Sequence, residues 1–246
     1  MRRASVLIAA LALVLAGCGG SSTPRPEGPF GTGDDQVWYV RPHGKPRAVV
    51  VLLHGLSRRT TLDFRPWLVH LAEQGDAAVF PLYEAEPPAG DARDNALAGL
   101  QIALRRLGNP HVPIVLVGHS RGGRLAAELA AVMPDWHLKA AAVVAIFPGV
   151  INPAFEPPSD FTKLDPSMRI WILVGEDDHG VGNSGALELF ERLRAFGFPN
   201  QNIIPDKVRS RPGFLATHMS VYDTSDTAHR IFWGRVDRIV DGVTGQ

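Results

Sequence analysis

Short apolar runs alternate with longer amphipathic segments along most of the chain, from about residue 36 to its end. Residues 48–53 form a nearly continuous aliphatic run, which is typical of a strand covered on both faces of a sheet. Residues 37–40 form a shorter run, which we expect to be an antiparallel strand at the sheet edge. The runs predicted as strands are 37–40, 48–53, 77–82, 114–117, 140–147, 169–174 and 203–208.

The segments between these runs carry apolar residues at helical spacing. In residues 91–107, Leu97, Leu100 and Leu104 fall on one face of a helix, and Gly108-Asn109-Pro110 ends it. The predicted helices are 67–73, 91–107, 124–133, 186–195 and 228–240. Strands that alternate with helices, with no repeat and no second domain, predict one α/β domain with a doubly wound, mostly parallel sheet.

The first residues have the layout of an export signal. Two arginines follow Met1, and an apolar stretch from Val6 to Ala16 comes next. This stretch is shorter than the roughly 20 apolar residues that span a bilayer. Residues 15–18, Leu-Ala-Gly-Cys, resemble the lipobox of bacterial lipoproteins, in which the cysteine becomes the first residue of the mature chain and carries lipid. The resemblance implies a lipoprotein signal peptide over residues 1–17.

Lipidation of Cys18 would anchor the protein in a membrane of the cell envelope, facing away from the cytoplasm. Two or three acyl chains hold a protein firmly, whereas one chain is marginal. The alternative is a plain signal peptide with an incidental cysteine. Residues 18–35 are rich in Gly, Ser and Pro, so we predict a flexible tether there, followed by a folded domain over residues 36–246.

The net charge bears on the kind of partner that the protein binds, and the cysteine content bears on whether it can form disulfides. The 25 basic and 25 acidic side chains give a formal net charge of zero. Nucleic-acid binding depends on clustered basic surface, so we expect no nucleic-acid partner. Cys18 is the single cysteine, which makes a disulfide within the chain impossible.

The strongest chemical motif is Gly118-His119-Ser120-Arg121-Gly122, which fits the pattern G-x-S-x-G. It follows the predicted strand 114–117 and opens the helix 124–133, the setting of a sharp turn that presents a serine hydroxyl. A Cβ atom at either glycine would collide with neighbouring backbone. The alternative, a glycine-rich turn with an ordinary exposed serine, does not require this setting.

From about residue 48 to the last helix, the chain resembles the α/β-hydrolase superfamily of serine hydrolases. The resemblance implies that Ser120 is a nucleophile. It also implies that the turn His54-Gly55-Leu56 follows a strand to form part of an oxyanion hole. By this match the backbone N–H groups of Leu56 and Arg121 are the donors. We expect His54 to hold the turn in place rather than to take part in catalysis.

The family orders its catalytic residues as serine, acid and histidine. Residues 175–181 resemble the family's acid loop, G-x-x-D-x-x-V, which singles out Asp178. Adjacent Asp177 is the rival, and a metal-binding acidic turn is a weaker alternative because it lacks further oxygen ligands. Of the histidines at or beyond the acid, His218 lies before the last helix, where the family places its base. His179 and His229 are the alternatives.

These assignments imply a carboxylesterase-like enzyme that cleaves an ester or related acyl bond through an acyl-enzyme. It would need no metal and no organic cofactor. Its substrate would be a small molecule or an acyl group on a carrier. An acyltransferase with the same three residues, or a non-catalytic surface lipoprotein that reuses the fold for binding, are the alternatives.

The segment 150–167 follows a predicted strand at the position where this family often carries a lid. It is short and holds four prolines, a density that does not suit a helical lid. We therefore expect an open or shallowly covered site, with a short or absent lid. We expect three aromatic residues either to line the site or to pack in the core: Phe147, Phe155 and Phe161. We expect three arginines near the mouth of the site: Arg58, Arg59 and Arg121.

Overall fold

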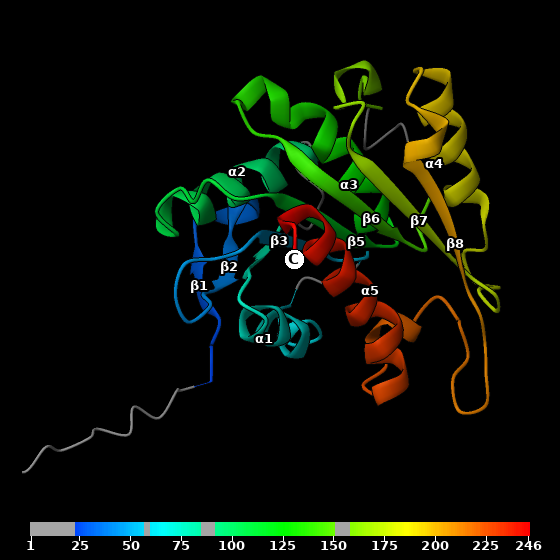
Figure 1. The fold of residues 1–246 in the computed structure, drawn as a ribbon, viewed down its shortest axis with the longest axis horizontal. Helices are drawn as coiled ribbons and strands as arrows, with labels where there is room; N and C mark the ends of the chain where they lie inside the picture. Colours follow the sequence, from blue (N-terminus) through cyan, green and yellow to red (C-terminus); the bar gives the residue numbers. More distant parts are fainter. Residues whose placement is uncertain (1–22, 57–59, 85–91, 151–157) are drawn as a thin grey trace, which may run out of the picture.

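A computed structural model describes residues 23–56, 60–84, 92–150 and 158–246. These residues form an eight-stranded sheet in the order β1-β2-β4-β3-β5-β6-β7-β8 (Figure 1). The β1–β2 and β2–β4 pairs are antiparallel, and the other neighbours are parallel. The strands are β1 Glu27–Phe30, β2 Val37–Val40, β3 Val49–Leu53, β4 Ala77–Pro81, β5 Ile114–His119, β6 Ala140–Ile146, β7 Arg169–Gly175 and β8 Ile203–Val208.

Helices cover both faces of this sheet. The helices are α1 Arg65–Glu73, α2 Ala92–Arg106, α3 Arg121–Val132, α4 Ser184–Ala195 and α5 Asp226–Thr244. Short 3-10 helices are η1 Gly33–Asp35, η2 Met133–Trp136, η3 Phe161–Lys163, η4 Asn200–Asn202 and η5 Ser220–Tyr222. The predicted fold class, a single α/β domain with a mostly parallel sheet, is confirmed.

The alternation of side chains along β3 shows how the two faces divide. All five residues of β3 are buried. Val49 and Val51 join a core cluster with α2, α3 and α4, and Val50 joins a second cluster with α1 and α5. Successive side chains of a strand point to opposite faces, so an unbroken apolar strand is required between two layers of helices.

The parallel strands end at one common edge of the sheet. β3, β5 and β7 run in the same direction, so the loops that follow them emerge on the same side. β8 pairs in parallel with β7, and the segment that follows β8 emerges there too. In open α/β sheets this carboxyl edge is the usual place for a binding site.

The amino-terminal boundary differs from the prediction. The expected tether, residues 18–35, contains β1 and η1, so the folded domain begins before residue 36. β1 rather than β2 is the antiparallel edge strand, and its Pro29 is tolerated because an edge strand can lack a ladder N–H. Glu27 accepts hydrogen bonds from the Tyr39 hydroxyl at 2.9 Å and from Arg41 Nε at 3.0 Å. These side-chain contacts help to attach the segment to the sheet, although its composition favours a flexible tether.

Some expectations fall partly or wholly outside the described residues. The signal peptide and Cys18 lie there, as does residue range 151–157 of the expected short lid. The rest of that lid region carries η3, whose Phe161 is buried in the core. Within the part of the chain that is described, we find no helix with both the length and the apolar character needed to cross a bilayer.

Candidate active site

Ser120 occupies the sharp turn between β5 and α3. Its φ of 55° and ψ of −121° lie in a region that non-glycine residues rarely adopt. The turn is held by the Ser120 N–H, which donates to the carbonyl of Ile146 at 2.9 Å. Strained backbone of this kind occurs at functional sites, where surrounding structure holds it in place.

The two glycines of the motif allow α3 to approach the strands closely. A Cβ atom at Gly118 would overlap the carbonyl group of Gly122, and one at Gly122 would overlap the carbonyl oxygen of Leu53. Both neighbours are backbone atoms, which cannot move aside as a side chain can. The sequence argument for glycine at these two positions therefore agrees with the geometry.

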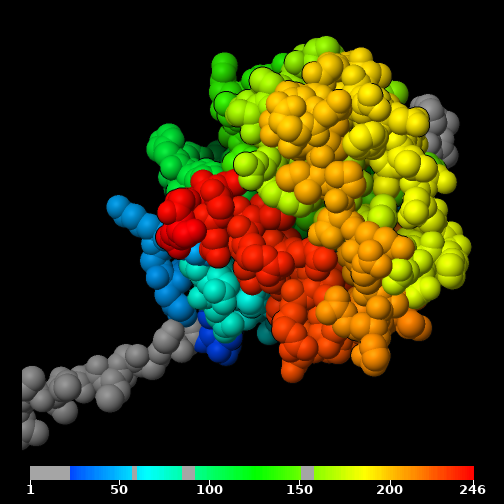
Figure 2. Space-filling model, turned by 45° about the vertical axis from the view of Figure 1, so that its right-hand side comes forward, coloured from blue at the N-terminus to red at the C-terminus, as the bar shows by residue number. Residues whose placement is uncertain are grey.

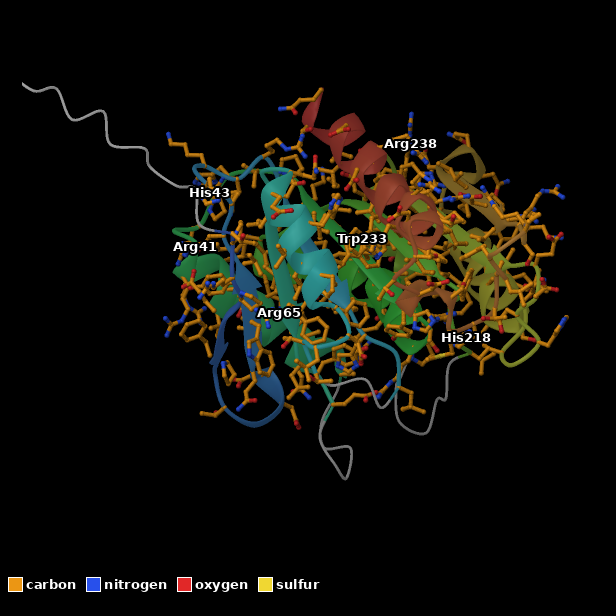
Figure 3. The ribbon with its side chains drawn as sticks, turned by 90° about the horizontal axis from the view of Figure 1, so that it is seen from below. Arg41, His43, Arg65, His218, Trp233 and Arg238 are labelled. Atoms are coloured by element: carbon orange, nitrogen blue, oxygen red, sulfur yellow. The ribbon has the colours of Figure 1, made fainter. Side chains whose placement is uncertain are left out.

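His218, which is labelled in Figure 3, lies in the segment between β8 and η5. Its Nε2 is 2.9 Å from Ser120 Oγ, and its Nδ1 is 2.8 Å from Asp178 Oδ2. A carboxylate can only accept, so Nδ1 carries the proton and Nε2 is left to accept the serine hydroxyl proton. This arrangement has the geometry of a serine nucleophile with an oriented general base.

Asp178 is fixed at the end of β7 by backbone donors. Its Oδ1 accepts from the N–H groups of Val181 at 3.0 Å and Gly182 at 3.3 Å, while Oδ2 faces His218. Burial alone would raise the pKa of Asp178, but these N–H groups and His218 outweigh it and lower the pKa below its usual value. The carboxylate is therefore ionised at neutral pH.

The rival residues point elsewhere. The carboxylate of Asp177 accepts a hydrogen bond from the Ser210 hydroxyl. The side chain of His179 is 86% exposed, with its Nε2 3.8 Å from Asp177. His229 lies on α5 and stacks on Trp233 with ring centroids 3.5 Å apart. The structure thus brings Asp178 and His218, and not these alternatives, to Ser120.

Two residues that sequence analysis did not single out support the loop that carries His218. His119 Nε2 is 2.8 Å from the backbone carbonyl of His218, and His119 Nδ1 is 3.0 Å from the Tyr222 hydroxyl. Because a carbonyl only accepts, Nε2 carries the proton and Nδ1 accepts from the tyrosine. His119 occupies a variable position of the motif, and Tyr222 lies in no motif. Only their contacts in the folded structure show that the two residues belong to the site.

A cavity of about 170 Å³ opens beside the serine. It is lined by Gly55, Leu56, His119, Ser120, His218, Met219 and Tyr222. The structure therefore places Leu56 at the cavity and Arg121 directly after the serine, at the start of α3. The roles of their N–H groups as oxyanion donors stay a prediction.

Ionic and aromatic contacts hold the residues next to Leu56 and Ser120 in the chain. The side chain of Arg121 forms an ion pair with buried Glu84, so its charge is offset. His54 is buried, with Nδ1 2.8 Å from the Gly55 carbonyl and its ring stacked on Tyr83 at 4.1 Å. These contacts match the expected structural role of His54. Arg58 and Arg59 lie outside the described residues.

The aromatic residues separate into different places. Phe147 is buried, with its ring centroid 6.3 Å from that of His218. Phe161 belongs to the core cluster of α2, α3 and α4, and its ring contacts that of Phe196 at the surface. Phe155 lies outside the described residues. Across the described ranges, we find no group of three or more His, Cys, Asp or Glu side chains able to hold a metal ion.

No family model and no curated protein matches this chain. Solved structures do match. Esterase B from Lactobacillus rhamnosis aligns over 91% of this chain and 86% of its own, with 14% identity and a TM-score of 0.68. A putative dienelactone hydrolase from Klebsiella pneumoniae aligns over 86% and 92%, with 16% identity and a TM-score of 0.58. A thermostable carboxyl esterase from Bacillus coagulans aligns over 85% and 94%, with 12% identity and a TM-score of 0.61.

Proposed function

Because the chain has the α/β-hydrolase fold, we propose that it is a serine hydrolase of the carboxylesterase type, cleaving an ester or related acyl bond. The observation that carries this proposal is the continuous chain of contacts from Ser120 Oγ through His218 to Asp178, at 2.9 and 2.8 Å. The similar structures of an esterase, a hydrolase and a carboxyl esterase support it.

In the first half of the reaction, Ser120 Oγ bonds to the acyl carbon while its proton passes to His218 Nε2. The carbonyl oxygen gains negative charge, for which the N–H groups of Leu56 and Arg121 are the proposed donors. One such donor typically changes the rate by ~10²–10³. His218 then gives its proton to the leaving oxygen, the bond between that oxygen and the acyl carbon breaks, and the alcohol departs.

In the second half, water replaces the alcohol. His218 Nε2 accepts a proton from the water as its oxygen bonds to the acyl carbon. The bond to Ser120 Oγ then breaks, and the proton on His218 returns to that oxygen. Asp178 stays ionised throughout and stabilises the imidazolium that forms twice per turnover.

Labelling with a fluorophosphonate tests this proposal, since such a probe phosphonylates an activated serine. We expect wild type to label at one site and Ser120→Ala to lose all labelling. Ser167→Ala, which removes an exposed serine outside the proposed site, is the matched control and should label like wild type. Equal labelling of wild type and Ser120→Ala would exclude Ser120 as the nucleophile.

We also propose that the domain is held at a membrane of the cell envelope by lipid on Cys18. The charged start, the apolar stretch and the Leu-Ala-Gly-Cys sequence support this assignment. The acyl substrate would then meet the enzyme outside the cytoplasm.

A further inference from the structure

A second cavity adjoins the one that holds Ser120. It has a volume of about 640 Å³ and shares Met219 and Tyr222 with the serine cavity. We call it the base-side groove, because the segment that carries His218 forms it. Its lining residues are Arg211, Gly213, Phe214, Leu215, Thr217, Met219, Ser220, Tyr222 and Asp223. This segment follows β8, and in Figure 2 it lies in orange beside the red α5.

Large apolar side chains are exposed in the base-side groove. Leu215 is 64% exposed and Met219 46%, and Leu56 at the serine cavity is 67% exposed. Single exposed apolar residues are ordinary, but apolar residues gathered at a concave site indicate binding. The described lining also holds one cationic and one anionic side chain, Arg211 and Asp223, so its charge favours neither an acidic nor a basic ligand.

Backbone contacts hold Leu215 in its exposed position. The Arg211 N–H donates to the Phe214 carbonyl, and the Phe214 N–H donates to the Arg211 carbonyl, both at 2.9 Å. Both neighbours of Leu215, Phe214 and Ala216, are buried. The Ala216 N–H donates to Ser210 Oγ at 2.9 Å. The turn is thus anchored on both sides of Leu215.

The direction of proton transfer decides which part of a substrate reaches this groove. The leaving oxygen must approach His218 Nε2, because that atom returns the proton to it. The groove begins beside His218, at Thr217 and Met219. The groove shares Met219 and Tyr222 with the serine cavity, so a chain attached to the leaving oxygen can extend from the serine cavity into the groove.

We propose that the base-side groove binds the alcohol portion of the substrate, and that this portion is an uncharged apolar chain. Leu215 and Met219 are then specificity-determining residues for the leaving group. This inference rests on the proposed serine hydrolase function, and it adds the substrate class: esters of apolar alcohols.

Acetate esters with a constant acyl group test the inference. The experiment measures kcat/KM for methyl, butyl and hexyl acetate on the full chain by titrating the released acid. We expect kcat/KM to rise at least about tenfold from methyl to hexyl acetate in wild type, as added methylenes become buried. Leu215→Ser should lower the hexyl-to-methyl ratio at least about threefold. Leu187→Ser, a leucine of α4 that is 60% exposed, is the control and should keep the wild-type ratio.

The outcomes separate the inference from the proposed function. If no acetate is hydrolysed and Ser120 takes no fluorophosphonate, the proposed function itself fails. If the esters are hydrolysed but the ratio is flat, or Leu215→Ser keeps the wild-type ratio, the assignment of the groove is overturned. Fluorophosphonate labelling of Leu215→Ser at the wild-type rate shows that the variant is folded and that its ratio reports on the groove.

Discussion

At the scale of single residues, two adjacent aspartates differ in what their side chains contact. Asp178 faces His218 Nδ1 at 2.8 Å, whereas Asp177 accepts from Ser210. We predict that Asp178→Asn lowers kcat by about 10⁴, because an amide favours the wrong tautomer of the histidine. Asp177→Asn is the matched control and should change kcat less than about tenfold. Turnover of p-nitrophenyl acetate measures both, and the reverse ranking would make Asp177 the acid.

The side chain of His119 holds the backbone of His218, the proposed base, and the Tyr222 hydroxyl holds the side chain of His119. Tyr222→Phe removes the hydroxyl that donates to His119 Nδ1 at 3.0 Å. Losing one neutral hydrogen bond costs about 1 kcal/mol, so we expect kcat to fall about five- to tenfold as His218 becomes less well placed. The rate of fluorophosphonate labelling should fall in parallel, while the midpoint of thermal unfolding falls by no more than about 2–4 °C. An unchanged labelling rate would contradict a positioning role.

The residue scale also shows what the sequence could reveal about the site. The sequence predicts Ser120 from a motif in which only glycine fits sterically at two positions. It predicts His218 from the position of this residue before the last helix. Asp178 is one residue from Asp177, and spacing alone does not separate them. His119 and Tyr222 come from segments about a hundred positions apart, so no local pattern connects them.

At the scale of elements, a buried ionic network links α3 to α4 behind the site. Arg124 is 1% exposed, and its Nε is 3.0 Å from Glu128, which also contacts Arg192 at 2.7 Å. Burial lowers the pKa of Arg124, while the charges of Glu128 and Glu188 oppose that shift. The apolar pattern of α3 predicts a buried face, but it does not indicate that charged side chains are buried there.

Glu128→Ala tests how strongly this network supports the fold. We predict a loss of about 3–5 kcal/mol in the free energy of unfolding, because the variant buries Arg124 without its main partner. Urea denaturation measures the loss. Glu191→Ala, an exposed residue of α4, should change stability by less than about 0.5 kcal/mol. A loss of under about 1 kcal/mol for Glu128→Ala would contradict the prediction, because it would show that the fold tolerates buried Arg124 without the Glu128 carboxylate.

Element boundaries followed the sequence where apolar periodicity was strong and departed from it where local contacts decide. α5 begins at Asp226, before its first predicted residue, because Ser225 caps it by accepting from the Ala228 N–H. β1 was missed because four residues with a glycine and a proline show no strand pattern. Its attachment depends on Glu27 and Phe30 meeting Tyr39, which no sequence period reveals.

At the scale of the whole molecule, the alternation of strands and helices was sufficient to predict a single α/β domain with a mostly parallel sheet. The sequence did not predict the order of the strands, and this order brings residues from four separate segments to one edge of the sheet. Attachment to a membrane is a separate proposal, which rests on the lipobox resemblance at Cys18.

Cys18→Ser tests the anchor. Wild type expressed in a bacterial host should sediment with membranes and yield an acylated amino-terminal peptide in mass spectrometry. The variant keeps the rest of the chain but offers no thiol for the lipid, so it should lose the acylated peptide and partition away from membranes. A mature wild-type chain that starts elsewhere than Cys18, without lipid, would contradict the anchor.

The most direct test of the central claim is to trap the acyl-enzyme. The enzyme is mixed with excess p-nitrophenyl acetate, quenched in acid during the initial burst, digested, and its peptides are analysed by mass spectrometry. We predict about one p-nitrophenol per active site in the burst and an acetyl group on Ser120 in wild type, with neither in His218→Ala. Ester hydrolysis with no acetyl group on Ser120, or with the acetyl group on another residue, would contradict the account.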